Sequence, residues 1–167
     1  MEFGFFSGNA LSVVDAKGRT SLPASYRATV EKRAREAGAT DASQIMLGEH
    51  RKHPCLEGYD PTYQATLYAR IQGRVRAAAE GDLDDDLDDA LLEGFGIYET
   101  VTFDAAGRMV IPANLRSIAG LDEPGAVCLF VAIADTFQIW NRDRFNAVHF
   151  DKPRVLRAIA GLKDPRR

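Results

Sequence analysis

The fold is indicated by a stretch of sequence that the chain contains twice, DAKGRTSLPASYR over residues 15–27 and DAAGRMVIPANLR over residues 104–116. Seven of the thirteen aligned positions are identical, and these include the Asp, the Gly, the Pro and the final Arg. Two copies are too few for a solenoid, which stacks at least three repeats to bury its core. The repeat therefore predicts a duplicated half-domain.

Each copy predicts a strand, a tight turn, a short returning strand and a helix. Asp at the first position and Gly at the fourth are the preferences of a type I turn. The expected turn-forming residues are Asp15, Gly18, Asp104 and Gly107. The proline of each copy stands where a helix begins, because the first helical turn does not use the N–H that proline lacks.

The first of these helices is expected to place Tyr26, Val30, Ala34 and Ala37 on one side and to end at Gly38. The second is expected to be shorter and to end near residue 120. Each half then returns to two strands, over residues 45–47 and 55–59 in the first half and over 127–133 and 137–140 in the second.

An insertion rich in acidic residues separates the two halves. It predicts a helix from Pro61, then a second helix with Leu83, Leu87 and Leu91 on one stripe. Residues 80–93 contain eight acidic side chains and no basic one. The net charge of the whole chain is −3, but the chain without this segment has 21 basic and 16 acidic residues and is therefore basic. The acidic run lacks the glycine and the spacing of a calcium-binding loop and is interpreted as a solvated helix face.

The repeated motifs resemble the MraZ family of bacterial transcription regulators, which have two AbrB-like (SpoVT-AbrB) half-domains. The resemblance covers residues 3–147 and is carried by DAKGR at 15–19, DAAGR at 104–108, HPCL at 53–56 and FQIW at 137–140. It implies an α+β fold in which the two half-domains pair as a swapped-hairpin (double-split) β-barrel with flanking helices. The expected divisions are a first half-domain at 3–60, a helical insertion at 61–96, a second half-domain at 97–147 and a basic C-terminal tail at 148–167.

The resemblance also implies a function. Such proteins are ring-forming homo-oligomers, not enzymes, and they bind double-stranded DNA at G-rich direct repeats. The repeats lie in the promoter of the division and cell-wall gene cluster, which the protein represses together with its own gene. Carried over by position, the DNA-binding residues are Arg19, Arg108 and Lys17, with Ala106 in place of the lysine in the second copy. No cofactor is implied, and the expected location is cytoplasmic and nucleoid-associated.

The chemistry of the turns agrees with this expectation. Arginine offers five donors in a planar fork that suits phosphate or the O6 and N7 atoms of guanine. The simpler alternative, a local ion pair of Arg19 with Asp15 or of Arg108 with Asp104, does not explain why both copies keep the arginine. For Arg27, which also recurs in the second copy, a structural ion pair and a phosphate contact stay equally open.

Two other functions are alternatives to DNA-binding regulation. An aspartic-dyad hydrolase needs two carboxylates about 3 Å apart that share a proton, and it expects Asp-Thr-Gly or Asp-Ser-Gly, whereas a basic residue follows each Gly here. An AbrB-like antitoxin with a toxin partner usually carries one half-domain per chain, so the duplication favours the MraZ resemblance.

The remaining motifs predict no metal site and no membrane segment. His50, His53 and Cys55 lack the fourth ligand or the second cluster that a zinc site needs, and His149 and Cys128 are not supported by spacing. Two cysteines, no secretory signal and a longest apolar run of nine residues (126–134) favour a cytosolic chain. The tail from residue 152 predicts either a helix docked on a neighbouring subunit or an arm touching phosphate.

Overall fold

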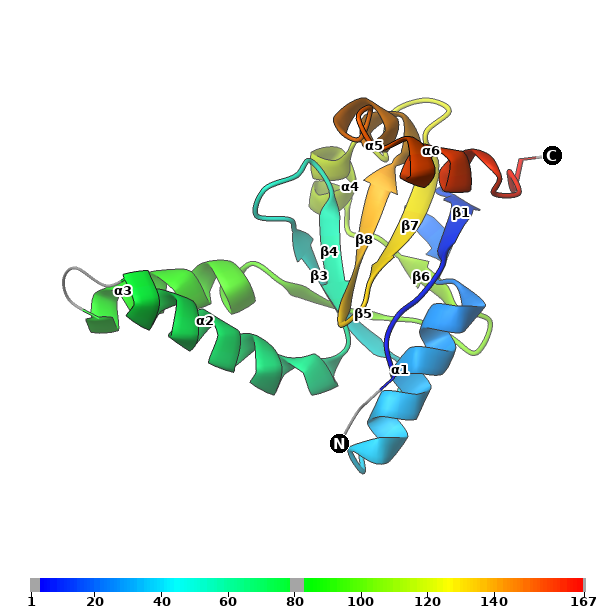
Figure 1. Ribbon diagram of the computed structural model, residues 1–167. Coiled ribbons are helices and arrows are strands. Elements are labelled where there is room, and N and C mark those ends of the chain that lie inside the picture. Colours follow the sequence, from blue (N-terminus) through cyan, green and yellow to red (C-terminus); the bar gives the residue numbers. More distant parts are fainter. Residues whose placement is uncertain (1–3, 79–82, 167) are drawn as a thin grey trace.

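The computed structural model describes residues 4–78 and 83–166, which form an α+β fold with a six-stranded antiparallel sheet and a separate two-stranded sheet (Figure 1). The strands are β1 (Asn9–Val13), β2 (Arg19–Ser21), β3 (Gln44–Glu49), β4 (Leu56–Tyr59), β5 (Glu99–Thr102), β6 (Arg108–Val110), β7 (Val127–Ile133) and β8 (Thr136–Asn141). The helices are α1 (Ala24–Glu36), α2 (Gln64–Ala78), α3 (Leu83–Leu91), α4 (Ala113–Ala119), α5 (Arg142–Val148) and α6 (Pro153–Ala160), with a 3-10 turn η1 (Pro61–Tyr63) and a π-helical turn η2 (Leu92–Gly96).

The strand order shows how the duplicated halves combine. The six-stranded sheet has the order β1-β7-β8-β4-β3-β5, and β2 pairs with β6 in the second sheet. Strands β1 to β4 of the first half correspond to β5 to β8 of the second. When each strand is exchanged for its counterpart, the same order results, read from the opposite end of the sheet. The two halves are therefore related by internal pseudo-twofold symmetry. The pairs β1–β7, β5–β3, β4–β8 and β2–β6 each join one strand from either half. Neither half forms its sheets alone.

The pairing gives a six-stranded sheet and a two-stranded sheet. Within residues 4–78 and 83–166, no ladder joins the outer strands β1 and β5, while β2 packs beside β1 and β6 packs beside β5. The expected α+β class is therefore confirmed, and the pairing between halves is established without closure of the hydrogen-bonded sheet.

The core is built from side chains of both halves. Phe6, Tyr26, Phe130 and Phe137 are almost completely buried, and their rings meet at centroid distances of 5.1–6.4 Å, in edge-to-face or tilted orientations. The expected apolar side of the first helix is confirmed except at Ala37, which is exposed because α1 ends at Glu36. Arg33 is also buried on that side of the helix.

The insertion forms a pair of helices, α2 and α3, that projects to one side of the sheet (Figure 1). In α2, Ile71 is buried and Leu67 and Val75 are half-buried, at fourfold spacing on one side of the helix. Of the acidic run, Glu80 and Asp82 lie outside the described residues, while Asp86, Asp88 and Asp89 are exposed on α3.

The C-terminal tail packs against the six-stranded sheet and helix α5. Its helix α6 docks on its own chain, where Ile159 is buried against Cys55, Leu129, Trp140 and Phe145. Ion pairs also hold the turn after the helix. Asp164 Oδ2 lies 3.6 Å from Arg142 Nη1 and 2.7 Å from Arg166 Nη2. Across the described part of the chain, no helix combines the length and the apolarity needed to cross a membrane.

Candidate nucleic-acid interface

The two repeated turns have nearly the same backbone geometry. The amide of Gly18 donates to the carbonyl of Asp15 at 2.9 Å, and that of Gly107 donates to the carbonyl of Asp104 at 2.8 Å. The φ angles of Gly18 and Gly107 are +83° and +82°. Both lie in the left-handed region, which is energetically unfavourable for a residue that has a Cβ atom. The turn therefore requires glycine in both copies.

The carboxylate of each turn holds the arginine that follows it. Oδ1 of Asp15 accepts from the amides of Lys17 at 3.0 Å and Arg19 at 2.8 Å, while Oδ2 accepts from Arg19 Nε at 2.6 Å. The second turn repeats these bonds from Asp104, including the 2.6 Å contact to Arg108 Nε. The Arg19 or Arg108 amide, and then its side chain, lowers the pKa of each carboxyl below the usual 3.8.

Each ion pair leaves most of its arginine available. The side chains of Arg19 and Arg108 are 63% and 76% exposed. Within the described residues, their hydrogen bonds to other side chains use only Nε. Four of the five N–H donors of each guanidinium, those on the two Nη atoms, are left for an external acceptor. The local pairing expected as the simpler alternative is thus present, and it orients each guanidinium without using all its donors.

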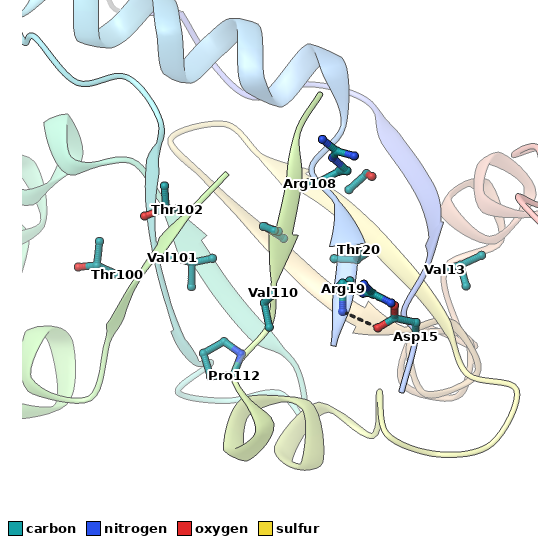
Figure 2. A pocket seen from close by; sticks show the side chains of 12 residues that line it. Val13, Asp15, Arg19, Thr20, Thr100, Val101, Thr102, Arg108, Val110 and Pro112 are labelled. Atoms are coloured by element: carbon teal, nitrogen blue, oxygen red, sulfur yellow. Dashed lines mark hydrogen bonds and ion pairs between the residues drawn. The ribbon is translucent and has the colours of Figure 1, made fainter. Parts of the chain in front are cut away.

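The strand register places both arginines on one face of a two-stranded ribbon. In the pair β2–β6, Arg19 lies opposite Val110 and Arg108 lies opposite Ser21. The middle residues of the two strands are buried, so these four side chains share the exposed face. Figure 2 shows Arg19 and Arg108 toward opposite ends of this ribbon, with Asp15 beside Arg19. The two arginines therefore occupy a diagonal of the ribbon face.

A groove of about 780 Å³ lies at this ribbon and is lined by both arginines (Figure 2) and by the buried middle residues Thr20 and Met109. Hydroxyl and aliphatic side chains complete it, among them Thr100, Thr102 and Val13. Val110 is 50% exposed in the groove. The third candidate, Lys17, is exposed in the first turn, and its counterpart Ala106 is exposed in the second. The three predicted DNA-binding residues therefore lie on the two turns that frame the ribbon.

The helix arginines of the repeat bond to the backbone of the two turns. Within the described residues, Arg27 and Arg116 form no ion pair. Each donates instead to a carbonyl in the turn of the other half: Arg27 Nη1 to Ala105 O at 2.6 Å and Arg116 Nη1 to Ala16 O at 3.1 Å. Both side chains are thus bound to the backbone of the candidate site.

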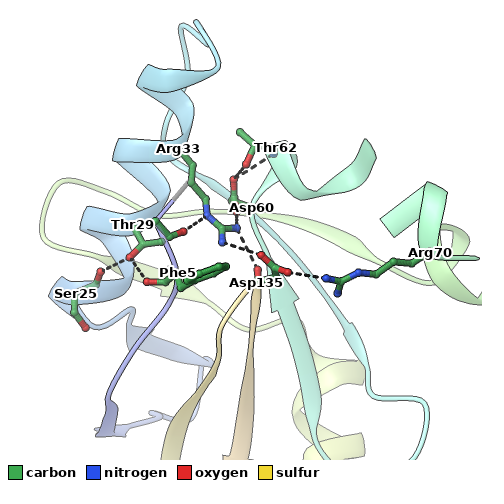
Figure 3. Close-up of polar contacts among 9 residues, drawn as sticks. Phe5, Ser25, Thr29, Arg33, Asp60, Thr62, Arg70 and Asp135 are labelled. Carbon is green, nitrogen blue, oxygen red and sulfur yellow. Dashed lines mark hydrogen bonds and ion pairs between the residues drawn. The ribbon is translucent and has the colours of Figure 1, made fainter. Parts of the chain in front are cut away.

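A buried arginine cluster that was not among the predicted sites lies away from this ribbon. Arg33 of α1 is buried and donates to Asp60 Oδ1 at 2.7 Å, to the carbonyl of Asp135 at 3.2 Å and to that of Gly4 at 2.7 Å (Figure 3). The carboxylate of Asp135 also accepts from Arg70 of α2 at 2.8 Å. The cluster joins the N-terminal segment, α1, the insertion and the β7–β8 turn. Its sequence signal was an arginine on the apolar side of the first helix.

The histidines lie closer together than their spacing suggested. The rings of His50 and His53 stack with centroids 5.1 Å apart, and His149 lies 6.1 Å from His53. His50 Nδ1 accepts from the amides of Lys52 and His53, and burial lowers the pKa of His50. No group of three His, Cys, Asp or Glu side chains within 4–78 and 83–166 is arranged to hold a metal ion.

The two cysteines are buried thiols. Burial raises the pKa of Cys55 and of Cys128, and neither forms a disulfide. The aspartic-dyad alternative finds no support in the carboxylate geometry, because both oxygens of Asp15 and of Asp104 accept bonds within their own turn. The chemistry that the site offers is therefore donation from two oriented guanidinium groups.

Comparisons with known proteins find several similar chains. The family model described as "MraZ protein, putative antitoxin-like" matches residues 95–151. A Rhodospirillum rubrum protein named "Transcriptional regulator MraZ" is 33% identical over 150 residues, which are 90% of this chain and 88% of that protein. A protein of the same name from Azotobacter vinelandii is 32% identical over 86% of this chain and 84% of its own length. Another from Gluconobacter oxydans is 31% identical over 81% of this chain and 75% of its own length.

Proposed function

Because the chain belongs to the MraZ family, we propose that it is a transcriptional regulator that binds double-stranded DNA through its two Asp-x-x-Gly-Arg turns. Arg19 and Arg108 are the principal contacts, and Lys17 adds a third beside the first turn. The target is a set of G-rich direct repeats in the promoter of the division and cell-wall gene cluster, where binding represses the cluster and the protein's own gene.

The observation that carries this proposal is the diagonal of two oriented arginines on one exposed ribbon face. A two-stranded β-ribbon fits the major groove of B-DNA, where guanine presents O6 and N7 as a pair of acceptors. The Nη edge of an arginine matches that pair bidentately, and the same edge matches phosphate. Two such groups on a pseudo-twofold ribbon meet the DNA at two points.

The turn carboxylates have a supporting part in this interaction. Asp15 and Asp104 accept from the Nε atoms, so each guanidinium is already oriented before DNA arrives. Orientation before binding reduces the side-chain entropy lost on association. The carboxylates are therefore assigned to holding the arginines and not to catalysis.

The same proposal includes a high-order homo-oligomer, a ring, and the swapped-hairpin barrel as its building block. The exchange of strands between the halves supports the barrel. The outer strands β1 and β5 each have a ladder partner on one side only among the described strands. Unpaired edge strands are available for association with another chain. A ring places one ribbon per subunit along tandem repeats, and weak single contacts then add through multivalency.

Footprinting on the chain's own upstream region tests this function. We expect protection of tandem G-rich boxes and far tighter binding to tandem boxes than to one isolated box. Native mass spectrometry of the same preparation is expected to show a high-order oligomer. Protection of no discrete site, together with a monomer at micromolar concentration, would contradict the proposal.

An AbrB-like antitoxin activity is the second candidate, because the description of the matching family model includes the words "antitoxin-like". This alternative predicts that a small toxin partner co-purifies with the chain and that operator binding depends on it. Purification from the native host separates the two functions. Specific DNA binding by the chain without a partner favours the regulator.

A further inference from the structure

The helix arginines of the repeat are arranged crosswise. Arg27 belongs to the first half, and its Nη1 donates to Ala105 O in the turn of the second half. Arg116 belongs to the second half, and its Nη1 donates to Ala16 O in the turn of the first half. Neither arginine bonds to the turn of its own copy within the described residues. This arrangement follows from the exchange of β2 and β6 between the halves.

The turn glycines lie directly against these guanidinium groups. A Cβ atom on Gly107 would lie 2.8 Å from Arg27 Nε, and one on Gly18 would lie 2.7 Å from Arg116 Nε. The carbonyl oxygens of Leu22 and Ile111 lie nearer still, at 2.7 Å from the Gly107 position and 2.6 Å from the Gly18 position. All these distances are shorter than van der Waals contact allows, so backbone and guanidinium of the opposite half together fill the space that a side chain would need. Glycine is thus required at the turn for two reasons, its positive φ angle and this close approach.

Backbone bonds follow the same crosswise pattern. The amide of Leu22 donates to Gly107 O at 2.8 Å, and the amide of Ile111 donates to Gly18 O at 2.9 Å. Each turn is therefore held from beneath by the strand end and by the helix arginine of the opposite half. The Nε atoms of Arg27 and Arg116 are buried and have no hydrogen-bond partner within the described residues. A buried N–H cannot reach a DNA phosphate, so this edge of each side chain faces protein.

We propose that Arg27 and Arg116 are positioning residues that act crosswise on the DNA-binding turns. Arg27 holds the turn that presents Arg108, and Arg116 holds the turn that presents Arg19. Each half therefore carries the support for the other half's DNA contact. This inference rests on the proposed function for its DNA consequence, while the crosswise support is a property of the free protein.

Amide hydrogen exchange of the free protein tests the support without DNA. Arg27→Met keeps most of the aliphatic stem and removes the donors. It is expected to speed exchange in the 104–108 turn by about three- to tenfold, the ratio produced by loss of one hydrogen bond, and to leave the 15–19 turn unchanged. Arg116→Met is expected to give the reverse pattern. Arg35→Met, an exposed position on α1, is the matched control and changes neither turn.

Equal acceleration in both turns, acceleration in the turn of the same half, or no change would overturn the crosswise support. Arg27→Lys and Arg116→Lys keep a charge and a donor and are expected to restore part of the protection, which a merely structural loss of packing does not explain. They also serve if a methionine variant fails to fold.

Titration with the footprinted operator tests the DNA consequence by double-mutant cycles. Arg27→Met is expected to weaken binding less than additively with Arg108→Ala and additively with Arg19→Ala, and Arg116→Met is expected to show the opposite pairing. Weaker binding by Arg27→Met with unchanged exchange at 104–108 would make Arg27 a direct DNA contact and overturn the inference. If the wild type showed no preference for operator, the proposed function would fail, and the exchange experiment would still decide the crosswise support.

Discussion

The two-stranded ribbon β2–β6 with its turns and the buried cluster around Arg33 both contain arginine–aspartate ion pairs. The pairs of the ribbon are exposed to solvent, and the pair of the cluster is buried. The Nε–Oδ2 distance is 2.6 Å in both turns, and Arg33 lies 2.7 Å from Asp60 Oδ1. The side chains of Arg19 and Arg108 are mostly exposed, whereas that of Arg33 is 3% exposed. Distance alone therefore does not distinguish the roles of these arginines.

The use of donors does distinguish them. Arg33 donates from Nε and Nη1 to protein acceptors on three different segments and places Nη2 within 3.6 Å of Asp135 Oδ1. The turn arginines are held only at Nε by their own turn. A buried charge whose donors are paired inside the fold fixes segments relative to one another. An exposed charge held at one edge keeps its other donors accessible to a partner outside the protein.

Arg33→Met is expected to give the largest effect, a loss of about 3–5 kcal/mol in the free energy of unfolding, because it leaves Asp60 as an uncompensated buried charge. Denaturant unfolding measures it, with Arg35→Met as the control on the same helix. Operator affinity per folded molecule is expected to stay unchanged. An unfolding free energy equal to that of the control would remove the distinction between the two regions.

Arg108→Ala is expected to weaken operator binding by about 1–3 kcal/mol if it reads a guanine edge, with little change in thermal unfolding because the side chain is mostly exposed. Arg19→Ala is expected to cost less, since Lys17 remains beside that turn. The lysine variants keep a phosphate contact but lose the bidentate fork. Fluorescence anisotropy with operator and scrambled duplexes separates these outcomes, and a larger effect from Arg19→Ala would contradict the ranking.

Acidification is expected to break the ion pairs Asp15–Arg19 and Asp104–Arg108 only below the usual titration range of an aspartate. The lowered pKa values of Asp15 and Asp104 mean that their contribution to stability is present above pH 3.8 and is lost as the pH falls through the folded-state values. The double variant Asp15→Asn/Asp104→Asn keeps the amide-accepting oxygens and loses the ion pairs. Its melting temperature is expected to fall less steeply than that of the wild type between about pH 5 and pH 2. Parallel curves would show that the pairs add nothing.

The smallest expected effect comes from the difference between the two copies. Lys17→Ala is expected to reduce the slope of log binding constant against log salt by about one, and Ala106→Lys is expected to increase it by about one. Operator preference is expected to stay the same, because a phosphate contact carries no sequence information. Lys52→Ala, outside the ribbon, serves as the control. A change in sequence preference with Lys17→Ala would assign that lysine a role in base recognition.

The sequence predicted the parts of this architecture that depend on neighbouring residues. The turns follow from Asp and Gly three positions apart, and the helix end at Gly120 follows from glycine's access to positive φ, which is +67° there. The β7–β8 hairpin was likewise predictable from two apolar runs and a short connection. These signals are local, so no knowledge of the partner segment was needed.

The contacts between distant segments were not predictable in the same way. Arg27 and Ala105 lie far apart in the chain, and nothing in either copy indicates that its helix supports the other copy's turn. The same holds for Arg33 and Asp135 and for the ring contact of His149 with His53. The docking of α6 was open in sequence, because an amphipathic helix fits its own sheet and a neighbour's equally well.

The central claim, that the two turns are the DNA-contacting surface, is tested most directly with Arg19→Ala/Arg108→Ala. Wild type and double variant are titrated against operator and scrambled duplexes at two salt concentrations, with melting temperature and oligomer mass measured on the same samples. The variant is expected to keep its fold and oligomer and to lose its preference for operator. Operator binding like that of the wild type would show that the turns do not contact DNA.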